Sequence, residues 1–140
     1  MNNQKLGAKF EKEFCEELAK RGFWVHRMAQ NSAGQQPADV IAAYYGIAYL
    51  IDCKVCSDDY FPFSRMEENQ RMAMQKWLEL KGTSPAFALK DSKGNIWMLD
   101  FEWALMQENS GQKGIRCEKG HRWLLTLDEW FHIETDLVRG

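Results

Sequence analysis

The chain is 140 residues long, 45% hydrophobic and 27% charged, which suits one folded domain and excludes a disordered or collagen-like chain. Its formal net charge of −2 excludes a protein coated in lysine, although a local basic patch is enough to bind nucleic acid. Residues 1–56 carry seven Lys and Arg against six Asp and Glu, whereas residues 98–140 carry five against eight, so a polyanion would meet the first half of the chain.

Three features predict a cytoplasmic protein without membrane spans. The longest apolar run, residues 40–51, contains three tyrosines and a glycine and is too short to cross a bilayer. The first five residues, Met-Asn-Asn-Gln-Lys, lack the apolar core of a signal peptide. Four cysteines are few for a disulfide-stapled domain, which favours a reducing compartment.

The first predicted element is a helix over residues 5–21. Its apolar side chains recur every four residues and form one stripe of Leu6, Phe10, Phe14 and Leu18. Gly22 follows at the position where glycine commonly ends helices. Residues 23–28 are typical of a strand, and residues 29–36 are typical of a polar loop.

A β-hairpin is predicted next. Residues 37–44 and 47–55 are rich in β-branched and aromatic side chains, and only Tyr45-Gly46 separates them. After the hairpin, Ser64-x-x-Glu67 is a capping box that predicts a helix ending near residues 81–82.

The remaining sequence predicts a second hairpin from residues 85–90 and 95–99, then a short helix over residues 101–108. Thr126-x-x-Glu129 is another capping box, so the tail is expected to end as a helix. The order α-β-β-β-α-β-β-α predicts an α/β (α+β) fold with a mixed sheet flanked by helices. Without an internal repeat or a linker, residues 1–140 are expected to form a single domain.

Asp52 is an acidic residue within an otherwise apolar predicted strand. It interrupts the apolar segment Ala48–Ile51, where an uncompensated buried carboxylate is costly. Lys54 lies two residues further along, so both side chains point to the same face of the predicted strand. Cys53 points to the opposite face, towards the core.

The predicted hairpin gives Asp52 a partner. If the turn centres between Tyr45 and Gly46, then Asp39 lies directly opposite Asp52, on the same face of the sheet. Two such close carboxylates repel each other unless a cation lies between them or one is protonated. A hard divalent ion with oxygen ligands and retained water is the expected occupant.

A third carboxylate could come from the first helix. Glu11 lies at one border of the apolar stripe, and Glu13 and Glu17 lie at the other, so periodicity does not choose among them. Two acids, a metal ion and a lysine on one strand form a site that can hydrolyse phosphodiesters. In such a site the ion polarises the phosphate and activates water, while the ammonium stabilises developing charge.

These motifs resemble the PD-(D/E)XK nucleases, and more narrowly the Holliday-junction resolvases of archaeal and RecU-like type. The resemblance covers residues 5–56, with looser similarity through Gln70 and residues 86–89. It is carried by the segments Gly7-x-x-Phe10-Glu11, Gly22-Phe23-x-Val25-x-Arg27, Asn31-Ser32-Ala33-Gly34, Pro37-Ala38-Asp39-Val40-Ile41-Ala42 and Ile51-Asp52-Cys53-Lys54. Two departures are that Ala38 separates Pro37 from Asp39, and that the chain has no room for the long stalk of RecU proteins.

The resemblance implies a restriction-endonuclease-like fold and a role for each matching residue. Glu11, Asp39 and Asp52 match metal-binding acids, Cys53 supplies a backbone carbonyl to the metal, and Lys54 matches the catalytic lysine. Gln70 matches a glutamine of the following helix, and it lies between Met66 and Met74 as a polar residue on an apolar stripe. The DNA-contact candidates are Ser32, which the resemblance places near the scissile phosphate, together with Asn31, Arg27, Lys5 and Lys9.

We therefore expect a Mg²⁺-dependent, structure-selective DNA endonuclease, with Mn²⁺ as a possible substitute. It would leave 5′-phosphate and 3′-hydroxyl ends, as the resemblance implies, and act on a four-way junction. Symmetric cutting of two strands calls for two sites and hence for a homodimer. The alternatives are another PD-(D/E)XK nuclease of repair or restriction, or a non-catalytic DNA-binding module. The pairs Cys53-x-x-Cys56 and Cys117-x-x-x-His121 also leave structural zinc as a minor alternative.

Overall fold

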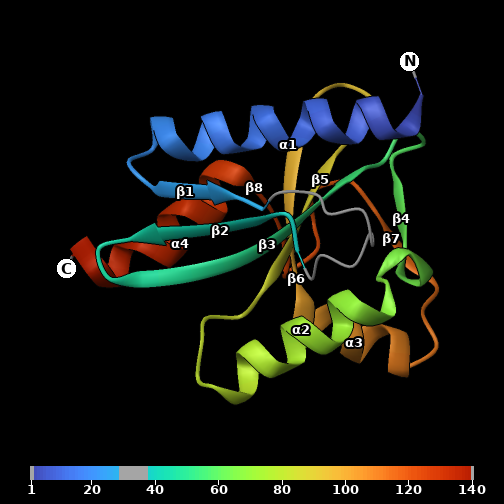
Figure 1. The fold of residues 1–140 in the computed structure, drawn as a ribbon. Helices are drawn as coiled ribbons and strands as arrows, with labels where there is room; N and C mark the ends of the chain where they lie inside the picture. The colour runs from blue at the N-terminus through green and yellow to red at the C-terminus, as the bar shows by residue number, and fades with distance from the viewer. Residues whose placement is uncertain (1, 29–37, 140) are drawn as a thin grey trace.

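The predicted elements form one mixed sheet with helices on both faces (Figure 1). The computed structural model describes residues 2–28 and 38–139. Over these residues the elements are α1 (Asn3–Lys20), β1 (Trp24–Arg27), β2 (Val40–Tyr44), β3 (Ile47–Val55), β4 (Tyr60–Pro62), the 3₁₀ helix η1 (Phe63–Arg65), α2 (Glu68–Glu79), β5 (Ala86–Lys90), β6 (Ile96–Asp100), α3 (Phe101–Asn109), β7 (Gly114–Arg116), β8 (Leu124–Thr126) and α4 (Leu127–Arg139). No helix in this described part is long and apolar enough to cross a membrane.

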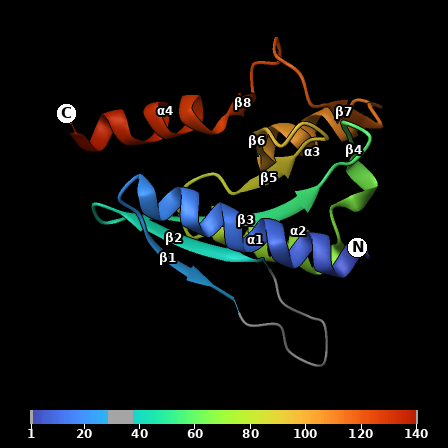
Figure 2. The ribbon, with the colours of Figure 1, turned by 90° about the horizontal axis from the view of Figure 1, so that it is seen from above.

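Helix α1 forms where its apolar stripe predicts it. The Asn2 side chain caps its first turn by accepting the Lys5 backbone N–H at 2.8 Å. Phe10, Phe14 and Leu18 are buried against the sheet. The helix gives way to a turn at Gly22, whose φ of +92° is the left-handed conformation that glycine adopts without a Cβ clash. Seen from above, α1 lies over β1, β2 and β3 (Figure 2).

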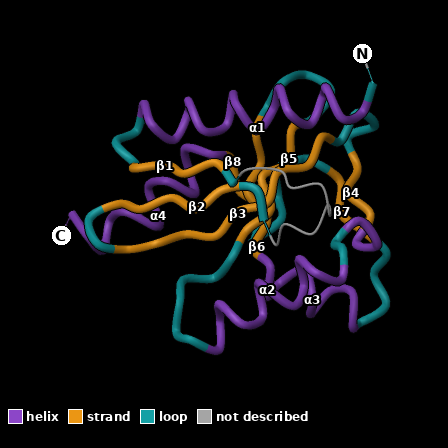
Figure 3. The backbone as a smooth tube through the Cα atoms, viewed as in Figure 1, coloured by secondary structure: helices purple, strands orange, loops and turns teal. Residues whose placement is uncertain are grey.

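The first hairpin has the predicted register. Val40 pairs with Ile51 and Tyr44 pairs with Ile47, so the connection contains only Tyr45 and Gly46 (Figure 3). Both turn residues have positive φ, at 48° and 82°, as the tightest hairpin turn requires. This register determines which side chains of β2 and β3 share a face.

The sheet is mixed, as predicted, with the strand order β1-β2-β3-β5-β6-β8. Strand β3 lies near its centre, antiparallel to β2 and parallel to β5. The parallel pairing requires a crossover connection, which α2 supplies. Strands β5 and β6 form the second predicted hairpin, and α3 begins directly after β6.

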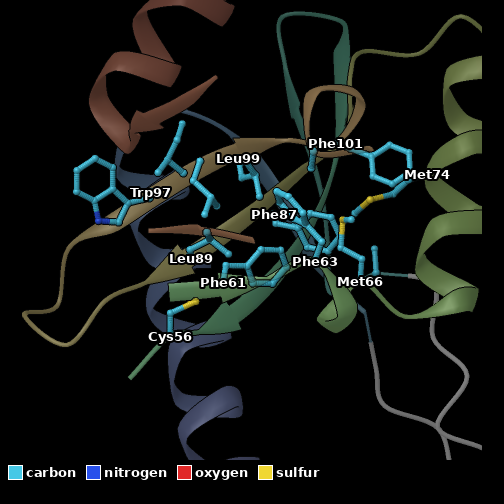
Figure 4. Packing of buried hydrophobic residues seen from close by; sticks show 14 of the residues in the cluster. Cys56, Phe61, Phe63, Met66, Met74, Phe87, Leu89, Trp97, Leu99 and Phe101 are labelled. Carbon is cyan, nitrogen blue, oxygen red and sulfur yellow. The ribbon is translucent and has the colours of Figure 1, made fainter. Parts of the chain in front are cut away.

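Two apolar clusters, one on each face of the sheet, form the core. On one face, α1 packs beside α4 through Leu127 and Trp130. On the other face, Met74 of α2 and Phe101 of α3 join a cluster that is rich in phenylalanine (Figure 4). Burial of each such side chain contributes about 1.5–3 kcal/mol, which fixes the sheet between the two helical layers.

Three short strands are absent from the predicted order. Strand β8 extends the sheet beyond β6, while β4 and β7 pair as a separate two-stranded sheet. Each has three residues, which is too few to display an alternating pattern in the sequence.

The predicted start of the second helix was wrong by one turn. Ser64 lies in η1, and Met66 is extended with ψ of 98°, so an α-helix cannot run through it. The capping box of α2 is instead formed by Glu67 and Gln70. At the tail the Thr126–Glu129 capping box is confirmed, with bonds of 2.9 and 3.2 Å.

Candidate active site

Asp52 and Lys54 project from β3 into a cleft of about 900 Å³ between α1 and the start of α2. Asp52 is only 1% exposed, although its neighbours Leu50 and Ile51 belong to the apolar core. The Lys54 Nζ atom lies 3.3 Å from Asp52 Oδ2. The side chains therefore share a face, as their spacing of two residues predicts.

Asp39 reaches the same cleft from the residue before β2. Its backbone N–H donates to the Ile51 carbonyl at 3.2 Å, which continues the hairpin pairing by one step. Its Oδ2 accepts the Cys53 backbone N–H at 2.8 Å. The hairpin therefore brings Asp39 to the side of Asp52, as its predicted register required.

Among the glutamates of α1, Glu11 is the one that enters the cleft. It is 5% exposed, and its Oε1 lies 3.5 Å from the Nε of Arg27 on β1. Glu13 instead pairs with Lys90 at 2.6 Å, and Glu17 pairs with Arg21 at 3.0 Å. The structure thus identifies Glu11 as the cleft residue among three glutamates that helical periodicity did not distinguish.

The carboxylates are held in an unfavourable electrostatic environment. Burial, and then the nearby Asp39 carboxylate, raise the pKa of Asp52 well above its usual value, while Lys54 acts in the opposite direction. Burial and Asp39 also raise the pKa of Glu11, against the opposing effect of Arg27. Within the described residues, Asp52 Oδ2 and Glu11 Oε1 are buried and have no well-formed hydrogen bond, although Lys54 Nζ and Arg27 Nε lie 3.3 and 3.5 Å from them. A metal ion bound by Asp39 and Asp52 would relieve the repulsion between these two carboxylates.

These donors fit a small, hard divalent ion. In residues 2–28 and 38–139, no group of three or more His, Cys, Asp and Glu side chains is arranged to hold a metal ion on its own. Mg²⁺ seldom needs such a cage, because it retains several waters and takes one or two protein carboxylates plus substrate phosphate oxygens. Asp39 and Asp52 supply such a pair, and Glu11 lies close enough to Asp39 for the two carboxylates to repel each other.

The start of α2 forms the opposite wall of the cleft through Glu67 and Gln70. Gln70 is 7% exposed, and its Oε1 accepts the Glu67 backbone N–H at 3.2 Å. The Glu67 carboxylate lies 3.8 Å from Lys54 Nζ, so this lysine lies near two acids. The sequence pattern predicted Gln70 but missed Glu67, because a lone glutamate at a helix start is ordinary.

The DNA-contact candidates are only partly brought together. Lys5 and Arg27 line the cleft, whereas Lys9 is exposed on α1 and is not among the lining residues. Asn31 and Ser32 lie outside the described residues. Arg65 of η1 also lines the cleft and was not predicted, since no pattern distinguishes a single arginine in a turn.

The cysteine pairs do not form a zinc site within the described part of the chain. Cys56 and Cys117 contact each other, and the Cys117 thiol lowers the pKa of Cys56 by hydrogen bonding. Cys53 lies instead with the cluster beneath α1. All four cysteines of the chain are free thiols.

Comparison with known proteins gives one family and one fold. The family model described as archaeal Holliday junction resolvase (Hjc) matches residues 2–124. Among solved structures, the chain is similar to the 1.6 Å structure of Archaeoglobus fulgidus Hjc, a Holliday junction resolvase from an archaeal hyperthermophile. The two share 20% sequence identity and a TM-score of 0.66 over 89% of this chain and 98% of the other. No curated protein matches the sequence.

Proposed function

The chain belongs to the archaeal Holliday junction resolvase family, the structure-selective nucleases that hydrolyse DNA phosphodiester bonds, and we propose that the Asp39–Asp52–Lys54 cluster carries out this reaction. The observation that supports the assignment is the convergence of two opposed carboxylates and a lysine on one face of the β2–β3 hairpin. Buried and mutually repelling acids are costly to folding, which is typical of a site kept for chemistry. The substrate is a four-way DNA junction, cut to leave 5′-phosphate and 3′-hydroxyl ends.

Asp39, Asp52 and the backbone carbonyl of Cys53 are the proposed ligands of a Mg²⁺ ion, with Glu11 as the third acid and Mn²⁺ as a substitute. When bound, such an ion polarises the scissile phosphate and lowers the pKa of a coordinated water. Asp39 is held for this task by the Cys53 N–H, which occupies one carboxylate oxygen at 2.8 Å. Arg27 orients Glu11 from the neighbouring strand at 3.5 Å.

Lys54 is the proposed catalytic cation. Its Nζ lies between Asp52 and Glu67, at 3.3 and 3.8 Å, so its position in the cleft is restricted from two sides. From there the ammonium group can stabilise the negative charge that develops on the phosphate oxygens when the phosphorus becomes pentavalent. Gln70 lies at the same wall and is proposed to orient the attacking water through its amide.

The protein surface around this cluster is proposed to hold the DNA backbone through Lys5, Lys9, Arg27, Asn31 and Ser32. Lys5 and Arg27 line the cleft and are therefore its nearest phosphate contacts. Two strands must be cut to resolve a junction, which supports a homodimer with one site per protomer. The four free thiols support a reducing compartment, and we propose the cytoplasm.

The direct test is a nicking assay with synthetic DNA. The protein is incubated with Mg²⁺ and either a four-way junction, a linear duplex or a flap of the same sequence. We expect Mg²⁺-dependent cleavage of the junction at least tenfold faster than that of the duplex or the flap. Equal cleavage of all three substrates would contradict the proposed selectivity, and cleavage unchanged by a chelator would contradict the metal assignment.

A further inference from the structure

Arg65 is a cation of the cleft that has no role in the chemistry described so far. It belongs to η1, is partly buried, and lines the same cleft as Asp52 and Lys54. Its Nη1 donates to the Val55 carbonyl at 2.8 Å, and its guanidinium carbon lies 5.9 Å from the centre of the Phe61 ring. The side chain is therefore held in place at the end of β3, one residue beyond Lys54.

The charge of Arg65 is not neutralised within the described residues. Of the other cations that line the cleft, Arg27 pairs with Glu11, Lys54 pairs with Asp52, and Lys5 is exposed to solvent. No described carboxylate lies within ion-pair distance of Arg65. Its hydrogen bonds all leave from Nη1, towards the Val55 carbonyl and, at 3.9 Å, the Cys56 sulfur. The Nε–H and both N–H groups of Nη2 thus have no described acceptor.

These free donors form the edge of the guanidinium that matches two oxygens of a phosphate. A DNA strand whose scissile phosphate lies at Asp52 and Lys54 must carry its adjacent phosphates along the cleft walls. We propose that Arg65 binds a phosphate next to the scissile one and so positions the substrate on β3. This inference rests on the proposed active site and assigns it a substrate-positioning residue.

The hydrogen bond from Arg65 to the Val55 carbonyl would also fix the position of a bound phosphate relative to the active site. Because Arg65 is anchored to the backbone of the strand that carries Asp52 and Lys54, a phosphate held by it is fixed relative to those two residues. A mobile surface lysine would give the same charge without this positional restriction.

The test compares Arg65→Gln with the control Arg122→Gln, since Arg122 is exposed and stacks on Trp123 outside the cleft. Glutamine retains an N–H donor for Val55 but carries no charge. Binding of a labelled four-way junction is measured over a series of salt concentrations. We expect Arg65→Gln to weaken binding about tenfold and to reduce the slope of log K against log salt by about 0.9, the loss of one phosphate contact.

A slope equal to that of the wild type in folded Arg65→Gln would overturn the proposal, because a purely structural role does not change counterion release. If Arg65→Gln gives no cooperative thermal transition, the proposal is tested on the wild type instead, by measuring how far phenylglyoxal modifies its arginines with and without the junction. Bound junction should protect Arg65 at least severalfold and leave Arg122 unprotected; equal modification of Arg65 with and without DNA would overturn the proposal. Wild-type protein that neither binds nor cuts the junction would refute the proposed function itself.

Discussion

At Asp52, the stability of the fold and the proposed catalytic role make opposite demands. The strand around it is apolar, and its carboxylate is buried between the repelling Asp39 carboxylate and the Lys54 ammonium, which lies 3.3 Å from Oδ2. Removing the Asp52 charge would relieve the repulsion with Asp39 but also break the ion pair with Lys54, whereas any metal bound there should stabilise the wild type.

Because these two effects on the metal-free fold oppose each other, the quantity that tests Asp52 is the response of the melting temperature to Mg²⁺. Saturating Mg²⁺ should raise the melting temperature of the wild type and leave that of Asp52→Asn unchanged, because the variant loses a charged ligand. Thermal melts with and without Mg²⁺ measure both responses. Titration calorimetry should detect Mg²⁺ binding to the wild type and none to Asp52→Asn. Asp58→Asn is a control, since Asp58 lines the cleft but is exposed. A variant that still responds to Mg²⁺ like the wild type would exclude Asp52 as a ligand.

Lys54→Ala separates catalysis from binding. Loss of a positioned charge at the phosphate should slow cleavage at least about 100-fold, whereas the dissociation constant for the junction should change only a few-fold because other cations line the cleft. Single-turnover cleavage and binding titrations measure the two quantities. Lys93→Ala, in the exposed turn after β5, should leave both unchanged. Equal turnover by Lys54→Ala would reject the assigned role.

At the scale of residues, the sequence predicted those site members that a periodic pattern brings together. Asp39 and Asp52 follow from the register of a two-residue hairpin, and Lys54 follows from strand alternation. Periodicity alone could not distinguish Glu11 from Glu13 and Glu17, and only the family resemblance singled it out. The other two glutamates are held by ion pairs with Lys90 and Arg21, which the helical pattern does not display. Glu67 carries only a capping signal, and Arg65 carries no local signal, so the sequence assigned neither residue to the cleft.

At the scale of elements, α2 joins the site to the helical layer through Gln70. This side chain lines the cleft and also completes the capping box of the helix by accepting the Glu67 N–H. Glutamate at the same position also completes a capping box, so the cap can be kept while the amide is removed.

Gln70→Glu should keep the capping box, but it places a carboxylate at a position that is 7% exposed in the cleft lined by Asp39 and Asp52, so we expect slower cleavage and a lower melting temperature in a chelator. Gln70→Ala should lose about 1 kcal/mol of stability through the cap as well as activity. Melts and cleavage rates on the same preparations test both expectations. If Gln70→Glu cleaves the junction at the wild-type rate, the role of Gln70 is limited to the capping box of α2.

The turn between β5 and β6 is held by Asp91, which is 8% exposed. Burial acts to raise the pKa of this carboxyl, but the Trp97 side chain and the Asn95 and Lys93 backbone N–H groups outweigh it and lower the pKa. Its stabilising effect is thus complete above the unfolded-state pKa near 3.9 and is lost as the pH falls through the lower pKa of the folded state.

Asp91→Asn is expected to cost about 1.5–3 kcal/mol at pH 7, because hydrogen bonds to a charged acceptor are lost. The difference in stability between wild type and variant should shrink as the pH falls from 5 to below the folded pKa. Denaturant unfolding across this range measures it, with Asp136→Asn as the control, since Asp136 is an exposed residue of α4. A difference independent of pH would show that the charge of Asp91 contributes nothing.

Most elements of the fold were predictable, because long segments display their periodicity. Helix α1, both hairpins, α3 and the tail helix agree with the sequence pattern. The three-residue strands β4, β7 and β8 depend on partners far along the chain, as β6 pairs with β8. The start of α2 was misplaced because two overlapping capping boxes share Glu67, and the extended Met66 selects the second.

At the scale of the whole molecule, one chain contains one candidate site, while resolution of a junction requires two cuts. Mixed dimers of wild type and Lys54→Ala should therefore nick a single strand of the junction, since only one protomer is active. Tagged subunits purified as heterodimers and assayed on junctions labelled on each strand provide the measurement. Symmetric cutting of both strands by these mixed dimers would refute the proposed division of one cut per protomer.

The two-residue turn at Tyr45 and Gly46 also limits the insertions that this part of the chain can tolerate. One residue inserted there would shift every pair between β2 and β3, so Asp39 would no longer face Asp52 even though both strands could remain in the sheet. The resulting chain would retain most of its core and lose the alignment of its acids. Relatives that keep the reaction should accordingly preserve the length of this connection more strictly than the identity of the residues in it.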